Sequence, residues 1–413
     1  MENIVKKTKE ASLKLVNLPI EARNYALEMI ANSLDLHQKQ IFDANQKDLQ
    51  EAQKLVESGE ISQAVFDRLK LDENKMRDMI AGVRDVIKLD NPINKCLLAR
   101  SLDEGLTLYK ISCPIGVLGV IFEARPDVIV QISALAIKSS NAVILKGGKE
   151  AIKTNKAIFE VITDALDCIK DFPKNVINQV YSREDVAQML EMEGYIDLII
   201  PRGGNSLVKF VQENTKIPVL GHADGICHIF VDESADFEMA KNIVIDAKTQ
   251  YPSACNSVET LLINNDFKYS DELLEALKNV EIKLIDNPES WAFEYGDKTL
   301  AYKFVSDVTE AIEHINKYGS GHTDCIISEN FESVEKFLNE VDSAGVYHNV
   351  STRFADGFRY GFGAEVGIST NKTHARGPVG LEGLTIYKYK LYGTGHVVKD
   401  YAQGLKQFHH SDL

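Results

Sequence analysis

The feature that most constrains the fold of this chain is a regular alternation of apolar runs and helical segments between residues 114 and 214. The first run, Pro114–Phe122, is apolar almost throughout, which is typical of a strand buried in a parallel sheet. A helix is expected directly after it, at Asp127–Lys138. Three more strand–helix pairs are expected at 142–145 and 150–169, at 176–181 and 183–192, and at 198–200 and 205–214. This alternation of strands and helices predicts a doubly wound α/β sheet that binds ligands at the carboxyl ends of its strands.

Regular secondary structure is also expected before and after this region. Residues 1 to about 90 are expected to be helical, and Asp72 is predicted to cap a helix that buries an apolar face. That face comprises Met76, Met79, Ile80, Val83 and Ile87. A second α/β unit is expected from about residue 229, with strands at 229–232, 258–263 and 325–328 and helices at 237–248, 271–279, 308–318 and 331–342.

Two further segments alternate polar and apolar residues without an obvious sheet to join. They are Gly105–Ile111 and Leu384–Tyr392, and both resemble half-exposed strands. We expect them to pair across subunits, because an isolated strand leaves its backbone groups unpaired. Between them, Gly345–Gly383 is rich in glycine and is expected either to be flexible or to wrap a site.

Composition excludes several classes of function. The net charge of −15 argues against general nucleic-acid binding, and any anion site therefore needs its own local cations or helix N-termini. Six scattered cysteines without a Cys-x-x-Cys pair predict a reducing cytoplasmic environment, with neither a disulfide framework nor a zinc knuckle. No apolar run is long enough to predict a membrane span or a signal peptide. His222, Cys227 and His228 have irregular spacing and no evident fourth ligand, so no metal site is predicted.

One cysteine occupies a segment suited to chemistry. Cys255 is expected in a loop between a helix and a strand, with small neighbours that let a substrate approach. Backbone N–H groups beside its sulfur could stabilise a thiolate or an oxyanion. The alternative is a small, buried apolar residue, as most free cysteines are, and this segment alone favours that alternative.

Two glycine turns suggest a nucleotide site. Lys146-Gly-Gly-Lys149 and Arg202-Gly-Gly204 each follow an expected strand and open an expected helix. Glycine, a cation and a helix N-terminus together suit phosphate or ribose groups, although the Gly-x-Gly-x-x-Gly fingerprint is absent. Arg125 follows the first strand, where it is either an anion contact or the partner of Glu123 in a surface ion pair.

Four segments closely resemble the gamma-glutamyl phosphate reductase family of the aldehyde dehydrogenase superfamily. They are Pro114–Val128, Ser140–Lys149, Thr249–Thr260 and Thr373–Gly383. The resemblance implies an α/β, aldehyde dehydrogenase-like fold with a Rossmann-type cofactor domain, an α/β catalytic domain and a small oligomerisation β-sheet. The cofactor domain is expected to comprise residues 1–98 and 113–228, with a return segment 362–383. The catalytic domain is expected at 229–361, and the oligomerisation element at 99–112 and 384–413.

The resemblance also implies the reaction. It implies that NADPH reduces L-glutamyl 5-phosphate to L-glutamate 5-semialdehyde with release of phosphate, through a thioester on Cys255. This is the second step of L-proline biosynthesis. Three alternatives stay open: another acylating aldehyde dehydrogenase of the superfamily, a cysteine hydrolase that uses Cys255 with His222, and a non-catalytic binding module.

Departures from the hydrolytic aldehyde dehydrogenases agree with this reaction. Leu220–Gly225 has no glutamate where those enzymes place the base that activates water, and Arg125 stands where they have an amide donor. We therefore expect Arg125 to contact the acyl phosphate or the glutamyl carboxylate.

The remaining site residues are implied by the same matching. Asn349 and Arg376 are implied to contact the substrate. Lys146 is implied to contact the adenosine ribose of NADP or its 2′-phosphate, and Glu294 the nicotinamide ribose. Gly203 and Gly204 are implied to lie on the pyrophosphate side of the cofactor. A homo-oligomer, either a dimer or a tetramer, is expected. Transient contact with glutamate 5-kinase is also expected, because glutamyl 5-phosphate cyclises readily.

Overall fold

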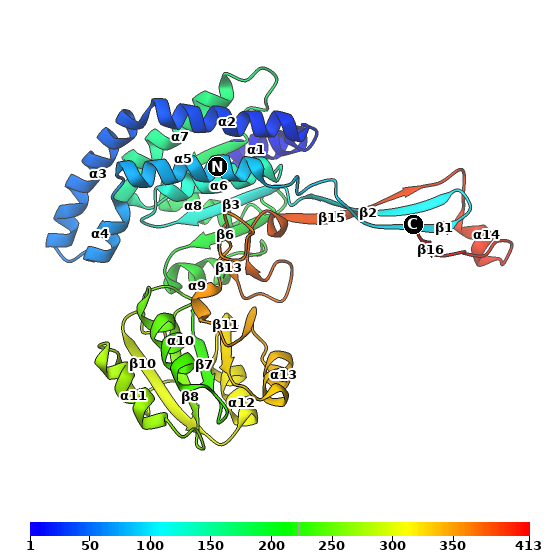
Figure 1. Cartoon of the computed structure of the whole chain (residues 1–413). Coiled ribbons are helices and arrows are strands. Elements are labelled where there is room, and N and C mark those ends of the chain that lie inside the picture. Colours follow the sequence, from blue (N-terminus) through cyan, green and yellow to red (C-terminus); the bar gives the residue numbers. More distant parts are fainter. Residues whose placement is uncertain (222–223) are drawn as a thin grey trace. The chain divides into compact units, whose positions relative to one another are not determined.

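The computed structural model describes residues 1–221 and 224–413, which form two compact units (Figure 1). Unit 1 contains Met1–Gly203, Val211–Val219 and Gly380–Leu413, and unit 2 contains Gly204–Phe210 and Leu220–Val379. The division passes through helix α9 (Asn205–Glu213). Residues 362–379, which the sequence analysis assigns to the cofactor domain, group with unit 2.

Unit 1 is built on a four-stranded parallel sheet with the order β5-β4-β3-β6. Its strands are β3 (Val117–Phe122), β4 (Ala142–Lys146), β5 (Ile177–Val180) and β6 (Leu198–Arg202). Every residue of β3 is buried, because strands flank it on both sides and helices cover the sheet. The connections are α6 (Asp127–Lys138), the 3₁₀ turn η1 (Lys149–Ala151) with α7 (Ile152–Asp167), and α8 (Arg183–Leu190). The alternation predicted from the sequence is therefore confirmed.

The N-terminal helices pack on this sheet and on the helices that connect its strands. They are α1 (Glu2–Leu15), α2 (Ile20–Leu36), α3 (Gln38–Glu57), α4 (Gln63–Leu69) and α5 (Glu73–Lys88). Helix α1 packs on β3, β4 and β5, while α2 packs on α5, α6 and α7. Asp72 caps α5 as predicted, since its side chain accepts the N–H of Lys75. The last buried residue on this helix is Val86, where the sequence analysis expected Ile87.

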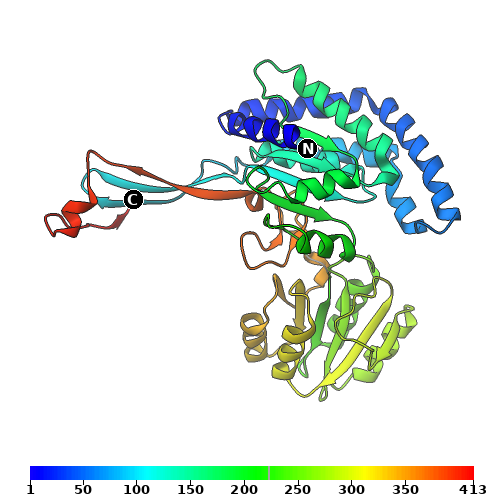
Figure 2. The same ribbon diagram turned by 180° about the vertical axis from the view of Figure 1, so that it is seen from behind.

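The second sheet of unit 1 is antiparallel and extends as an arm from the helices and the parallel sheet (Figures 1 and 2). Its order is β15-β2-β1-β16, with β1 (Cys96–Asp103), β2 (Leu106–Pro114), β15 (Thr385–Tyr392) and β16 (Ser411–Asp412); helix α14 (Val398–Ala402) precedes β16. Strand β15 pairs with β2 along its whole length. The expectation that these two segments need partners from another subunit is therefore wrong.

Unit 2 contains a six-stranded parallel sheet with the order β12-β11-β7-β8-β10-β9. Its strands are β7 (Cys227–Val231), β8 (Val258–Asn264), β9 (Lys283–Asp286), β10 (Thr299–Val305), β11 (Thr323–Ile327) and β12 (Gly345–His348). Successive strand residues face opposite sides, so Ile229 and Phe230 belong to different cores. Helices α10 (Phe237–Thr249) and α11 (Ser270–Asn279) cover one face, and α12 (Val308–Tyr318) and α13 (Phe331–Glu340) cover the other.

The glycine-rich segment after β12 has little regular structure. It contains only the short elements η2 (Thr352–Phe354), β13 (Ile368–Ser369) and β14 (Gly377–Pro378), and η3 (Glu382–Leu384) then leads into β15. Within the described part of the chain, no helix combines the length and apolar character needed to cross a membrane.

Candidate active site

Cys255 lies in a tight turn between α10 and β8 and is half-buried. The N–H of Ala254 donates to the carbonyl of Tyr251 at 3.1 Å, and the N–H of Ser257 donates to the carbonyl of Ala254 at 2.8 Å. The hydroxyl of Ser257 donates to the carbonyl of Ala247 in α10 at 3.1 Å. These bonds fold the loop back on the helix that precedes it, so the thiol is held firmly and remains accessible.

Two backbone N–H groups beside the Cys255 sulfur are available as hydrogen-bond donors. Among the described residues, neither the N–H of Cys255 nor that of Asn256 has a hydrogen-bond acceptor. Two adjacent free N–H groups beside a thiol can stabilise an oxyanion that forms on an attacked carbonyl. Cys227, whose Sγ donates to the Cys255 carbonyl at 3.4 Å, is fully buried, and burial raises its pKa well above the usual range. Of these two thiols, Cys255 is therefore the one suited to nucleophilic attack.

Glu294 is connected to the Cys255 loop through Gly225. Its Oε2 accepts the N–H of Gly225 at 3.0 Å. The backbone of Gly225 lies directly against Cys255, since a Cβ on Gly225 would be 2.1 Å from the Cys255 carbonyl oxygen and 2.5 Å from its Cα. The segment before Gly225 includes His222, which lies outside the described residues.

A buried ion pair joins the two ends of the Cys255 loop. Lys248, next to last in α10, contacts Glu259, the second residue of β8, with 2.8 Å between Nζ and Oε2 and no exposure of either side chain. The N–H of Tyr295 donates to the same Oε2 at 3.2 Å, which links the pair to the segment that carries Glu294. Burial raises the pKa of Glu259 to about 7 and lowers that of Lys248.

In unit 1, predicted site residues lie at the carboxyl ends of neighbouring strands. Arg125 follows β3, Lys146 ends β4, and Gly203 follows β6. Lys146 is half-buried, and burial lowers its pKa. A Cβ on Gly147 would lie 2.1 Å from Nδ2 of Asn155 and 3.0 Å from the ring of Phe122, so a side chain there would force these two groups to move.

Comparison with known proteins identifies the family. The sequence profile of the Aldehyde dehydrogenase family matches residues 1–296. The gamma-glutamyl phosphate reductase of Brachyspira hyodysenteriae is 58% identical over 427 residues, which cover 100% of this chain and 99% of that protein. The enzyme of that name from Acetivibrio thermocellus is 51% identical over 420 residues, with coverage of 98% and 96%. The crystal structure of gamma-glutamyl phosphate reductase from Thermotoga maritima has a TM-score of 0.92 and 38% identity, and it covers 96% of this chain and 99% of that one.

The chain belongs to the gamma-glutamyl phosphate reductases, within the aldehyde dehydrogenase family. The resemblance stated from the sequence, the aldehyde dehydrogenase-like α/β fold and the oxidoreductase class are thereby confirmed. Membership of the aldehyde dehydrogenase family implies a nicotinamide cofactor.

The other predicted site residues of this gamma-glutamyl phosphate reductase have different surroundings. Arg125 is exposed and follows Ala124, whose φ of 45° is unusual for a residue with a side chain. Asn349 uses its side-chain amide on Ser328, accepting the N–H at 3.0 Å and donating to the carbonyl at 3.2 Å. Arg376 forms an ion pair with Asp342 at 3.1 Å. Both Asn349 and Arg376 are thus engaged with other protein groups.

Sequence reasoning missed the Lys248–Glu259 pair. The available signal was a carboxylate inside the apolar run Val258–Ile263, which was expected to be a buried strand. A charge at such a position needs a buried partner, and the partner eleven residues earlier could not be chosen from the sequence.

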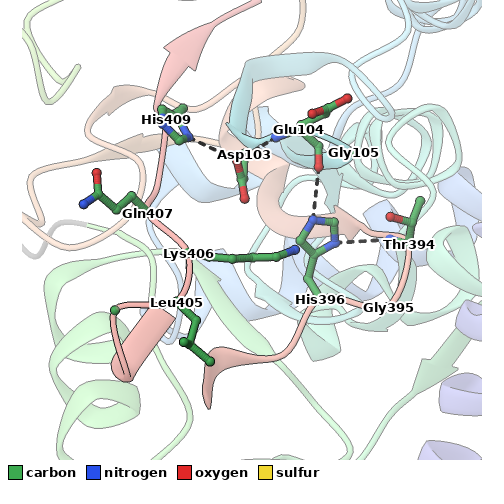
Figure 3. A pocket seen from close by; sticks show the side chains of 11 residues that line it. Asp103, Glu104, Gly105, Thr394, Gly395, His396, Leu405, Lys406, Gln407 and His409 are labelled. Atoms are coloured by element: carbon green, nitrogen blue, oxygen red, sulfur yellow. Dashed lines mark hydrogen bonds and ion pairs between the residues drawn. The ribbon is translucent and has the colours of Figure 1, made fainter. Parts of the chain in front are cut away.

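A hollow of about 750 Å³ lies on the arm of unit 1 (Figure 3). It is lined by residues 103–105 at the turn between β1 and β2 and by residues 394–396, 404–407 and 409. His396 contacts the carbonyl of Glu104 at 3.1 Å, and His409 contacts Asp103 at 3.1 Å. None of the predicted site residues lines this hollow, so it is not the candidate active site.

Replacement of Gly225 by alanine tests its contact with Cys255. We expect a loss of stability of about 1–3 kcal/mol and a lower turnover number, because the new Cβ forces the Cys255 backbone to move. Thermal unfolding and steady-state kinetics measure the two effects. Gly82→Ala is the control, since a Cβ at Gly82 meets nothing within 4 Å. Equal behaviour of the two variants would show that Gly225 tolerates a side chain.

Proposed function

We propose that this enzyme reduces L-glutamyl 5-phosphate to L-glutamate 5-semialdehyde and phosphate with NADPH, in the second step of L-proline biosynthesis. The observation that carries the proposal is a half-buried Cys255 on a tightly bonded loop, beside two N–H groups without acceptors among the described residues. Relatives that share about half of the sequence or more and carry the name gamma-glutamyl phosphate reductase support the substrate.

The chemistry at Cys255 has two stages. The thiolate attacks the C5 carbonyl, a C–S bond forms, and the C–O bond to phosphate breaks with its electron pair leaving on phosphate. The N–H groups of Cys255 and Asn256 stabilise the oxyanion. When bound, NADPH supplies the hydride that reduces the thioester. Collapse of the thiohemiacetal then breaks the C–S bond, which releases the aldehyde and regenerates the thiolate of Cys255.

Each residue proposed for the cofactor has a chemistry that suits one part of a nicotinamide dinucleotide. Lys146 supplies a half-buried cation for the adenosine ribose or its 2′-phosphate. Gly203 and Gly204 precede helix α9, and a Cβ on Gly204 would meet nothing within 4 Å, so a pyrophosphate can approach the helix N-terminus. Glu294 keeps one carboxylate oxygen for the nicotinamide ribose while the other accepts the N–H of Gly225.

The remaining proposed substrate contacts are Arg125, Asn349 and Arg376. Arg125 is exposed at the carboxyl end of β3, where it can meet the acyl phosphate or the glutamyl carboxylate. An unchanged KM for glutamyl phosphate in Arg125→Lys would contradict this role.

The reverse reaction tests the proposed function. We expect purified enzyme with glutamate 5-semialdehyde and NADP⁺ to form NADPH only when phosphate is present, because phosphate must cleave the thioester. Absorbance of the reduced nicotinamide is the measurement. NADPH formation without phosphate would make water the acyl acceptor. Faster turnover of an unrelated aldehyde with phosphate would support the alternative, another acylating aldehyde dehydrogenase.

The proposal extends to partners and location. Strand β15 is an edge strand, with no strand on its outer side in the described chain, and its side chains Tyr387, Tyr389 and Leu391 are exposed. Both features support a homo-oligomer, a dimer or a tetramer. A monomer in sedimentation at micromolar concentration would contradict it.

We place the enzyme in the cytoplasm, with transient contact to glutamate 5-kinase because the intermediate cyclises. Failure to channel glutamyl phosphate in a coupled assay would argue against that contact.

A further inference from the structure

Arg353 lies in η2 of unit 2 and is 8% exposed. Its Nε donates to Oε1 of Gln250 at 2.9 Å, and its guanidinium carbon lies 5.9 Å from the ring centroid of Tyr251. Both partners belong to the loop that carries Cys255. A cation from a segment about one hundred residues later in the chain is therefore fixed against this loop.

The segment around Arg353 is bonded to the other side of the same loop. The hydroxyl of Thr352 donates to the carbonyl of Asn256 at 2.7 Å, and Nδ2 of Asn256 donates to the carbonyl of Ala355 at 2.8 Å. Asn256 directly follows Cys255 and Gln250 precedes it, so the Arg353 segment is attached on both sides of the nucleophile. This arrangement fixes the guanidinium beside the Cys255 loop.

The charge of Arg353 is available to a ligand. Burial lowers its pKa, and the neighbouring Arg359 lowers it further, while negative charge on Cys255, Asp246 and Asp356 raises it. The guanidinium nevertheless stays protonated in the physiological range. Among the described residues, its two terminal nitrogens have no acceptor, and neither is a fully buried orphan atom. They can therefore reach a solvent-borne oxyanion.

We propose that Arg353 is a substrate-binding residue that holds the phosphoryl oxygens of the substrate beside Cys255. The inference rests on the proposed function and names a residue that the sequence analysis did not identify. Phosphate is favoured over the glutamyl carboxylate because its bridging oxygen is bonded to the carbon that the sulfur attacks, whereas the carboxylate lies at the other end of the glutamyl chain. When the C–O bond breaks, the electron pair leaves on phosphate, and the guanidinium fork stabilises that charge through two hydrogen bonds.

The first test uses inorganic phosphate and needs no turnover. Phosphate is expected to slow alkylation of Cys255 by iodoacetamide in the wild type, measured by mass spectrometry of the Cys255 peptide. In Arg353→Met the concentration needed for protection is expected to rise on the order of ten- to hundredfold, since a charge-assisted hydrogen bond is lost. Arg353→Lys should recover part of the protection. Absence of protection in the wild type would overturn the proposal.

The second test separates the two anionic groups of the substrate in the reverse reaction. In Arg353→Met the KM for phosphate is expected to rise on the order of ten- to hundredfold, while the KM for the semialdehyde and for NADP⁺ stays within about threefold. Arg77→Met removes an exposed guanidinium from α5 in unit 1 and serves as the control, with little change expected in any KM.

Other outcomes would overturn the proposal. A rise only in the KM for the semialdehyde would mean that Arg353 binds the carboxylate. A lower kcat with unchanged KM and a lower unfolding temperature would mean that Arg353 only supports the loop, and Arg353→Gln guards against poor folding of the methionine variant. If phosphate protects Cys255 but the wild-type reverse reaction does not require it, the proposed function fails while the phosphate site stands.

Discussion

Replacement of Cys255 by alanine is expected to reduce both directions of the reaction on the order of 10⁴-fold or more, because the nucleophile that forms the thioester is lost. Cys255→Ser should be nearly as inactive, since a serine hydroxyl is a far weaker nucleophile at neutral pH. The protein should remain folded, because Cys255 is only half-buried and its Sγ makes no hydrogen bond among the described residues. Steady-state assays and thermal unfolding of the purified variants measure both quantities.

The control for this experiment is Cys168→Ala, which removes an exposed thiol of unit 1. That variant should keep full activity and lose only its own site of alkylation. Activity of Cys255→Ala within tenfold of the wild type would remove the thioester from the mechanism. A loss of folding in Cys255→Ala would instead assign the residue a structural role.

Replacement of Lys248 by methionine is expected to lower the free energy of unfolding by about 3–5 kcal/mol, because it leaves the carboxylate of Glu259 buried without its partner. Methionine preserves most of the volume of lysine, so loss of the charge dominates. Lys241→Met on the same helix is the matched control. Its ion pair with Glu238 is partly exposed and should contribute no more than about 1 kcal/mol. Urea denaturation followed by circular dichroism measures the difference.

The double variant Lys248→Met, Glu259→Met separates the charge effect from packing. It should lower the free energy of unfolding by less than the sum of the losses in the two single variants, since removing both partners leaves no unpaired buried charge. Glu259 also accepts the N–H of Tyr295, so the segment with Glu294 should loosen and the KM for the cofactor should rise. Equal losses in the free energy of unfolding for Lys248→Met and Lys241→Met would show that the buried ion pair contributes no more to stability than the exposed one.

The sequence alone determined the order and type of most elements. Helix α6 begins and ends at the predicted residues, because its apolar periodicity, Pro126 before it and the buried run before that are all local features. Strand β10 was missed, because its polar and apolar residues are too mixed to mark a strand until β8 and β9 pair with it. The arm was misread for a related reason. Strands β1, β2 and β15 stabilise one another through pairing across nearly three hundred residues, and no local pattern encodes that pairing.

For the candidate site, the sequence determined which residue types were present, and its resemblance to a family identified Cys255 as the expected nucleophile. Only the tertiary structure decided what surrounds the sulfur. The contact with Gly225, the buried pair of Lys248 and Glu259, and Arg353 against the loop each join residues from separate segments of unit 2. Burial changes the pKa of these groups and fixes their partners. Burial depends on how strands and helices pack, which periodicity along the chain does not specify.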